Sequence, residues 1–273
     1  MRPSGSSTDQ VPAGVAAESR PDSEPERPAA PTSDTDVELA EQARTFSLPA
    51  PDRLGEEVTD LWSTHYHLWE ATEVEAEDGF VVLDSDDRPF PAGSPVHLTG
   101  RDWCMTALEG SGHVRRLDDS ELTLNYSAQG EVHVECDRFI GASWRSQGRV
   151  RFGTAEGPYG DGVSGYQLVP FRTIAVDRDQ ATIPYGAAVF IPAAVGQTFE
   201  HDGASWTHDG WFFAGDTGGA IRDEHIDTFT GSTTDPALAY VTSSPDAPRF
   251  VAHRIADDHA TARLLEDLHR GGP

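Results

Sequence analysis

Two aspartates flank a glycine pair in the most informative stretch of the sequence. Asp216 ends an apolar run and opens the turn Asp216–Gly219, and Asp227 follows within a second run of strand-like residues. By the two-residue period of a strand, Asp227 lies on the same face as the Phe229 ring. A carboxyl beside apolar surface and near other carboxyls keeps its proton to a higher pH. Such a group can act as the general acid that glycosidic bond cleavage requires.

A third aspartate, Asp177, ends the upstream run Phe171–Val176. A loop follows it and leads into the apolar run Ala187–Pro192. Because each of these aspartates stands at the end of a strand-like run or within one, the folded sheet must bring them together if they act as one site.

The elements that must position these carboxyls are short strands. Between Phe46 and Ile255, runs of apolar and β-branched residues alternate with clusters of Gly, Pro, Asp and Asn, which indicates a barrel or sandwich rather than alternating strands and helices. A helix is predicted only at His259–His269, capped by Asp257 or Asp258. The predicted strands are 61–68, 80–83, 96–99, 121–126, 131–135, 173–176, 187–191, 210–214, 226–229 and 249–254.

The bulk composition narrows the function. The 273 residues carry a formal net charge of −26, and every one of the 20 basic residues is Arg. This charge repels nucleic acid and anionic lipid, so neither is expected as a partner. The composition is typical of proteins kept soluble at high salt, although a GC-rich genome also replaces Lys with Arg.

The amino-terminal residues predict a disordered tail. Residues 1–45 are rich in Pro, Ser and acidic residues and cannot bury enough apolar surface to offset ordering. They contain no apolar core of a signal peptide, and nowhere does the chain approach the roughly 20 apolar residues of a membrane span. Cys104 and Cys136 either pair in an oxidising compartment or stay as two separate buried thiols; the sequence does not choose between these.

The order of motifs resembles a known family. The string Ala-Val-Asp at 175–177, Asp-Thr-Gly-Gly-Ala-Ile at 216–221 and Ile-Asp at 226–227 is similar to the three-aspartate (3D) domain of the MltA-type lytic transglycosylases. The resemblance also takes in the opening strand around Tyr66 and the glycine turn at 110–112. It implies an all-β fold, a six-stranded double-psi β-barrel with β-rich insertions. The implied catalytic domain is 46–256, with its motif core at 171–231 and a C-terminal helix in 257–273.

The resemblance also implies roles. Asp227 is the expected acid/base, with Asp216 and Asp177 lining the cleft and keeping its proton bound. The expected reaction cleaves the bond between N-acetylmuramic acid and N-acetylglucosamine in peptidoglycan, outside the cytoplasmic membrane, and closes a 1,6-anhydro ring without cofactor or metal. The expected substrate-binding residues are Thr217, Gly218, Gly219, Asp209, Tyr66 and Thr106.

Several departures and alternatives remain open. Arg222 and Asp223 stand where the family usually has Lys-Gly, and a longer loop after Asp177 makes Asp179 an alternative first aspartate. Asp216-Thr217-Gly218 also matches the triad of aspartic proteases, although no second triplet is present. The alternatives to a transglycosylase are a glycan-binding or regulatory barrel without turnover and a glycoside hydrolase on the same barrel.

Overall fold

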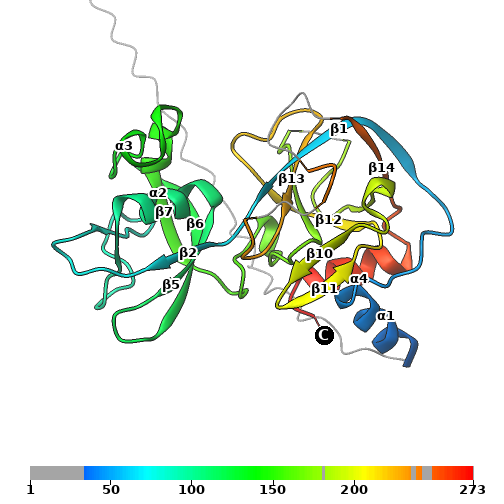
Figure 1. Ribbon diagram of the computed structural model, residues 1–273, viewed down its shortest axis with the longest axis horizontal. Coiled ribbons are helices and arrows are strands. Elements are labelled where there is room, and N and C mark those ends of the chain that lie inside the picture. Colours follow the sequence, from blue (N-terminus) through cyan, green and yellow to red (C-terminus); the bar gives the residue numbers. More distant parts are fainter. Residues whose placement is uncertain (1–33, 180–181, 235–237, 242–247, 273) are drawn as a thin grey trace, which may run out of the picture.

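The computed structural model describes residues 34–179, 182–234, 238–241 and 248–272. They form two lobes, a closed barrel and a smaller lobe of sheet and helix, which lie side by side in Figure 1. The chain leaves the barrel after its first strand, builds the smaller lobe, and then returns to complete the barrel. Within these ranges, no helix is both long and apolar enough to cross a bilayer.

Six strands close the barrel, which confirms the predicted all-β class. Two pairs are parallel, β1 with β13 and β8 with β12, and the other four neighbouring pairs are antiparallel. In order around the barrel, the strands are β1 (Glu56–Tyr66), β13 (His225–Phe229), β8 (Thr173–Val176), β12 (Trp211–Thr217), β9 (Ala188–Phe190) and β14 (Phe250–Arg254).

The barrel buries apolar side chains on both faces of its wall. Along β12, Phe212 and Ala214 join the core inside the barrel. Trp211 and Phe213 alternate with them and pack outside, under the helices. Because both faces are covered, this strand reads as a continuous apolar run rather than an alternating one.

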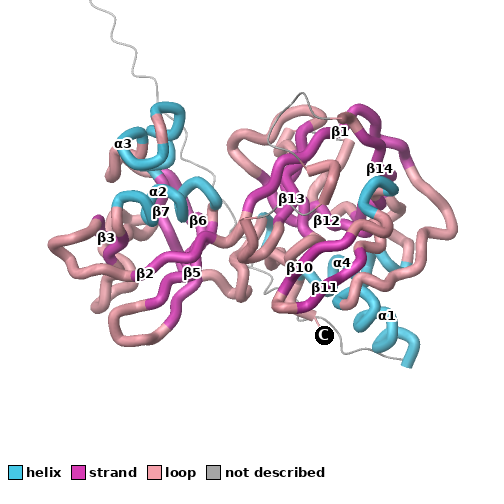
Figure 2. The backbone as a smooth tube through the Cα atoms, in the orientation of Figure 1, coloured by secondary structure: helices cyan, strands magenta, loops and turns pink. Residues whose placement is uncertain are grey.

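Two helices cover the outside of the barrel. They are α1 (Asp34–Arg44) and α4 (Ala260–His269), which pack against each other at one edge of Figure 2. The ring of His259, rather than Asp257 or Asp258, caps α4 by accepting a hydrogen bond from the Thr261 N–H. Of the predicted tail, 34–44 forms α1, while 1–33 lies outside the described residues. A hairpin of β10 (Thr198–His201) and β11 (Ala204–Thr207) and the short turns η2 (Val163–Gly165) and η3 (Pro192–Ala194) complete this lobe.

The smaller lobe has its own core around Trp103, Leu124 and Phe152. Its four-stranded sheet, in the order β2-β5-β6-β7, packs against a helix, α2. The elements are β2 (Trp69–Thr72), β3 (Phe80–Val81), β4 (His97–Leu98), α2 (Gly100–Glu109), β5 (Ser111–Arg115), β6 (Glu121–Gln129), α3 (Asp137–Ile140), η1 (Ala142–Arg149) and β7 (Val150–Thr154).

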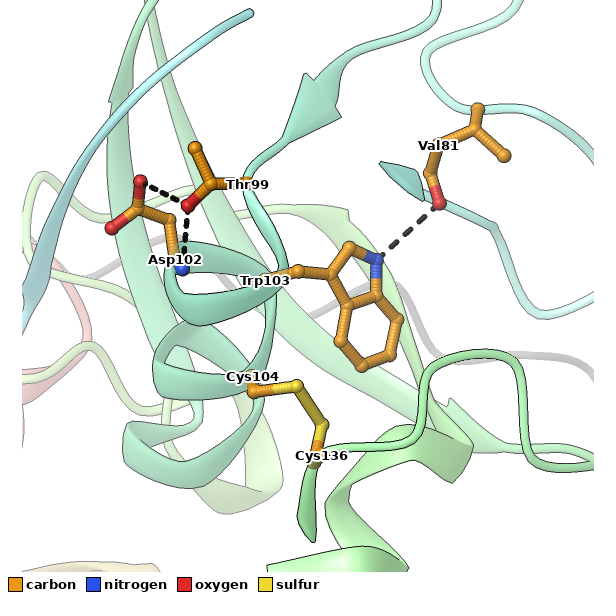
Figure 3. The surroundings of a disulfide bond; sticks show 6 residues. All are labelled: Val81, Thr99, Asp102, Trp103, Cys104 and Cys136. Atoms are coloured by element: carbon orange, nitrogen blue, oxygen red, sulfur yellow. Dashed lines mark hydrogen bonds between the residues drawn. A yellow bond between two sulfur atoms is a disulfide. The ribbon is translucent and has the colours of Figure 1, made fainter. Parts of the chain in front are cut away.

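A disulfide joins Cys104 on α2 to Cys136, immediately before α3, and resolves the alternative left open by the sequence (Figure 3). Beside it, the Trp103 indole N–H donates to the Val81 carbonyl, which ties α2 to β3. The predicted strand at 131–135 is wrong, because this segment is irregular and leads into the disulfide.

The helix α2 corrects the expectation that the only helix lies at the end of the chain. Thr99 caps α2 by accepting from the Asp102 N–H, and the Thr99 hydroxyl donates back to the Asp102 carboxylate. Gly110 ends the helix with a φ of 86°, a conformation that glycine adopts without strain. The glycine turn read from the sequence is therefore the end of a helix followed by the start of β5.

Candidate active site

Strand β1 places a threonine against the expected acid. Because β1 and β13 pair in parallel with Thr64 opposite Asp227, the two side chains project to the same side of the sheet. The Thr64 Oγ1 lies 2.9 Å from Asp227 Oδ1 and 2.7 Å from His225 Nε2. Asp227 keeps partial exposure to solvent, while His225 is buried.

Asp216 is held by Tyr66, which lies on β1 together with Thr64. The Tyr66 hydroxyl donates to Asp216 Oδ2 over 2.9 Å. The pairing of β12 with β8 shifts register between Ala214 and Asp216, an irregularity of the kind that redirects a side chain. Tyr66 itself is 9% exposed, so it supports Asp216 from the interior rather than offering a flat ring to a ligand.

A third carboxyl, Glu109, comes from the other lobe and was missed by the sequence analysis. It stands at the end of α2 and accepts the His67 backbone N–H over 3.0 Å. The His67 ring lies 3.3 Å from the same carboxylate oxygen. In the sequence, Glu109 is marked only by its position directly before Gly110-Ser111. That position points to the site only if α2 is recognised as a helix that ends there.

Burial raises the pKa of all three carboxyls. For Asp227, burial comes first and the negative charges of Glu109 and Asp216 add to it, so the pKa is about 8. A hydrogen bond that Thr64 donates to the ionised carboxylate acts in the opposite direction. Burial raises the pKa of Glu109 to about 7 and that of Asp216 to about 6. At neutral pH the Asp227 carboxyl therefore bears its proton while Asp216 is mostly ionised.

Asp177 has different surroundings. Its carboxylate accepts the backbone N–H groups of Asp179 and Asp223 over 3.1 and 2.9 Å, and Arg222 lies 4.0 Å away. These N–H groups, with a further contribution from the Arg222 charge, hold the pKa of Asp177 below its usual value. The structure thus joins Asp216 and Asp227 with Glu109 and places Asp177 at the turn that leads into β13.

The turn after Asp216 has one open position. The Thr217 hydroxyl donates to the Val176 carbonyl over 3.0 Å, which fastens the turn to β8. A Cβ on Gly218 would lie 2.7 Å from Ile221, so the backbone passes too close for a side chain. Gly219 is exposed and faces open space. A ligand can therefore approach the backbone most closely at Gly219.

The remaining two expected substrate-binding residues, Asp209 and Thr106, are buried within the scaffold of the two lobes. Asp209 accepts from the Arg172 guanidinium over 2.5 and 2.7 Å, and both side chains are almost completely buried. Thr106 is fully buried in α2 and packs closely against Gly112. Neither residue contributes a group to the carboxyl cluster.

Over the described ranges, no three His, Cys, Asp or Glu side chains are arranged as a metal site.

Comparison with known proteins adds a family match. Residues 172–239 match the model of the 3D domain, and no curated protein matches the chain. Similar solved structures include E. coli MltA with bound chitohexaose, 16% identical over 71% of each chain with a TM-score of 0.46. Another is the membrane-bound lytic murein transglycosylase of Agrobacterium tumefaciens, 17% identical over 84% of this chain and 85% of that one, with a TM-score of 0.46. MltA from Neisseria gonorrhoeae is 14% identical over 74% of each, with a TM-score of 0.45.

Proposed function

We propose that this chain, which carries a 3D domain over residues 172–239, is a lytic transglycosylase of peptidoglycan. Its substrate would be the β-1,4 bond between N-acetylmuramic acid and N-acetylglucosamine. The observation that carries the proposal is the proton-bearing carboxyl of Asp227, partly open to solvent and flanked by the acidic groups of Asp216 and Glu109. A general acid for sugar chemistry at neutral pH needs such a raised pKa.

In the proposed reaction, Asp227 first gives its proton to the bridging oxygen as the bond from that oxygen to C1 of the muramic residue breaks. The resulting carboxylate then takes the proton of the C6 hydroxyl, whose oxygen bonds to C1 and closes the 1,6-anhydro ring. Asp227 ends in its starting state, and no water is consumed. The ionised Asp216, held by Tyr66, stabilises the positive charge that develops at C1.

Glu109 favours a second candidate, a glycoside hydrolase. A hydrolase needs a second carboxylate to activate water or to act as nucleophile. Glu109 supplies a carboxyl from the opposite lobe, and its pKa of about 7 suits proton exchange at neutral pH. The two enzymes differ in product, because hydrolysis leaves a reducing end where the transglycosylase leaves an anhydro ring.

The arrangement of the barrel supports the double-psi topology proposed for it. A pseudo-twofold axis between β13 and β8 would exchange the parallel pairs β1·β13 and β12·β8, and it would exchange β14 with β9. The Cys104–Cys136 disulfide is typical of an oxidising compartment, which supports a location in the cell envelope where glycan strands lie.

The test is a digest of purified sacculi with the full chain, followed by mass analysis of the released products. We expect anhydro-muropeptides from the native chain and none from Asp227→Asn. A matched control, Glu121→Gln, also removes one carboxylate, but its side chain is 68% exposed on β6. Reducing ends in place of anhydro ends would establish the hydrolase. Retention of the chain on sacculi without release would indicate a binding module and contradict the proposal.

A further inference from the structure

His225 is fixed beside Thr64 by stacking as well as by hydrogen bonding. Its ring lies on the Trp62 indole with centroids 3.7 Å apart and planes inclined by 7°. The parallel register of β1 and β13, which sets Trp62 opposite His225, places this stack two positions away from Thr64 and Asp227, on the same side of the sheet. The His225 side chain is therefore a rigid group whose Nε2 points at the Thr64 hydroxyl.

The neutral ring of His225 fixes where its proton lies. Burial lowers the pKa of His225 to about 4, so the ring is uncharged at neutral pH. The Ala220 carbonyl accepts a hydrogen bond from the ring, while Nε2 faces Thr64. The single ring proton therefore lies on Nδ1, and Nε2 is left as an acceptor. While Asp227 bears its own proton, Thr64 can donate its only hydrogen to that nitrogen.

With its hydrogen committed to His225, Thr64 presents a lone pair to Asp227. We propose that His225, acting through the Thr64 hydroxyl, is a positioning residue that holds Asp227 in its proton-bearing form. In that form the carboxyl O–H donates to Thr64 Oγ1, and the chain of hydrogen bonds from Asp227 through Thr64 and His225 to Ala220 is complete. When Asp227 loses its proton, Thr64 must turn its hydrogen to the carboxylate, and the buried His225 Nε2 loses its partner.

We call the hydrogen-bonded chain from Asp227 through Thr64 to His225 the relay. Several charged groups lie near it but are not part of it. Asp216 and Glu109 act on Asp227 directly through their negative charges, and Tyr66 donates its hydrogen bond to Asp216. Asp177, Asp223 and Glu224 line the pocket behind His225, and the Arg249 guanidinium lies 5.8 Å from the Trp62 ring. An exchange of the neutral imidazole for another neutral ring leaves all of these charges in place. Such an exchange therefore isolates the relay.

The experiment uses His225→Phe, which keeps a flat ring over Trp62 and removes both nitrogens. Without the Nε2 acceptor, Thr64 is free to donate to the carboxylate, so the pKa of Asp227 falls by about one pH unit, the shift produced by one net hydrogen bond of ordinary strength. The readout is a pH titration of the Asp227 carboxyl carbon by NMR in the free protein, assigned by its loss in Asp227→Asn. In a Thr64→Val background, the same His225→Phe exchange should change nothing.

The matched control is Ser63→Ala. Ser63 lies next to Thr64 on β1, and its hydroxyl bonds to Thr228 on β13 over 2.9 Å, so the change removes a similar link without touching Asp227. A fall in pKa that persists in the Thr64→Val background, or no fall in His225→Phe, would overturn the relay. In the unmodified protein, nitrogen shifts of His225 should show the Nδ1–H tautomer, and the Nε2–H tautomer would also overturn it.

The catalytic meaning of the relay rests on the proposed function, but its test does not. The titrations need no substrate, so a chain that failed to cut sacculi could still show the relay, and an active enzyme could lack it.

Discussion

Two regions of this molecule use the same side chain for opposite purposes. Asp209, beneath the outer helices, is surrounded by donors: it accepts two bonds from Arg172 and the backbone N–H groups of Leu48 and Trp211. Asp227, on β13, has one hydroxyl contact at Thr64 and acidic neighbours. The first carboxyl is a fixed anion and the second keeps its proton.

The difference lies in the donors supplied by the surroundings. A buried carboxylate is stable when a cation and N–H groups satisfy its oxygens, and it then ties segments together. Burial and nearby negative charges raise the pKa of a carboxyl that has few hydrogen-bond donors around it, so such a carboxyl binds a proton instead. Asp177 belongs to the first group, because two backbone N–H groups hold it ionised. Glu109 belongs with Asp227, because burial raises its pKa to about 7. Burial also raises the pKa of Asp216, but only to about 6, so Asp216 lies between the two groups and is mostly ionised at neutral pH.

The strongest test of this comparison removes the carboxylic acid from the reactive region. Asp227→Asn keeps the shape but cannot transfer a proton, so we expect turnover of sacculi to fall by about 10³-fold or more. The midpoint of thermal unfolding should stay the same or rise, because the substitution removes a carboxyl whose burial costs free energy. Retention of more than a tenth of the activity would show that Asp227 is not the acid.

The opposite result is expected in the region of fixed anions. Arg172→Met leaves Asp209 buried without its cation, and the apparent free energy of unfolding in urea should fall by about 3–5 kcal/mol. The double variant Arg172→Met/Asp209→Leu removes both charges and should recover much of this loss. Activity per folded molecule should remain near that of the native chain, and a selective loss of activity would break the division between the regions.

The pH dependence sharpens the comparison further. As pH rises through the pKa of Asp227, about 8, the acid form is lost, so kcat/KM should fall about tenfold per pH unit above that value. Glu109→Gln removes one of the charges that hold the proton on Asp227, so this decrease should begin at a lower pH. Glu121→Gln is the control for charge alone and should leave the profile in place.

The smallest effect is expected at Asp177. Asp177→Asn offers an N–H group where the backbone of Asp179 or Asp223 also donates, so the turn before β13 should loosen. The thermal midpoint should fall by less than in Arg172→Met. Because the pKa of Asp177 is lowered in the fold, its stabilising contribution is present near neutral pH and is lost as acid protonates it. If Asp177→Asn and the native chain had the same thermal midpoint at every pH from neutral to acid, this role would be contradicted.

The sequence could predict the barrel because its strands are marked locally. Thr173–Val176 was predicted with the bounds that β8 has, and the ends of β9, β12, β13 and β14 were placed within a few residues. The smaller lobe is harder to predict from the sequence. Thr99, Asp102 and Gly110 mark the two ends of α2, but the helix lies among short strands and is not evident from the pattern around it. The pairing of Cys104 with Cys136 depends on the fold of that lobe rather than on any local pattern.

The site could be predicted only in part, for a related reason. Asp216 and Asp227 lie in one contiguous motif, and their meeting follows from a single turn and strand. Glu109 reaches them from the other lobe, which no local pattern reveals. Asp177 and Asp209 look the same as Asp227 in sequence, because the N–H groups and the guanidinium that bind their carboxylates come from residues whose proximity only the fold determines.

The insertion of the smaller lobe after β1 has a consequence for biosynthesis. The amino-terminal strand of the barrel is made early, yet both of its partners, β13 and β14, lie near the carboxyl terminus. The smaller lobe, whose sheet and disulfide use only residues between 69 and 154, can fold while the rest of the chain is still being synthesised. The barrel cannot close until β13 and β14 have been synthesised. Thr64 and Asp227 therefore cannot meet until β13 has been made, and a nascent chain that stops before it carries no assembled carboxyl cluster.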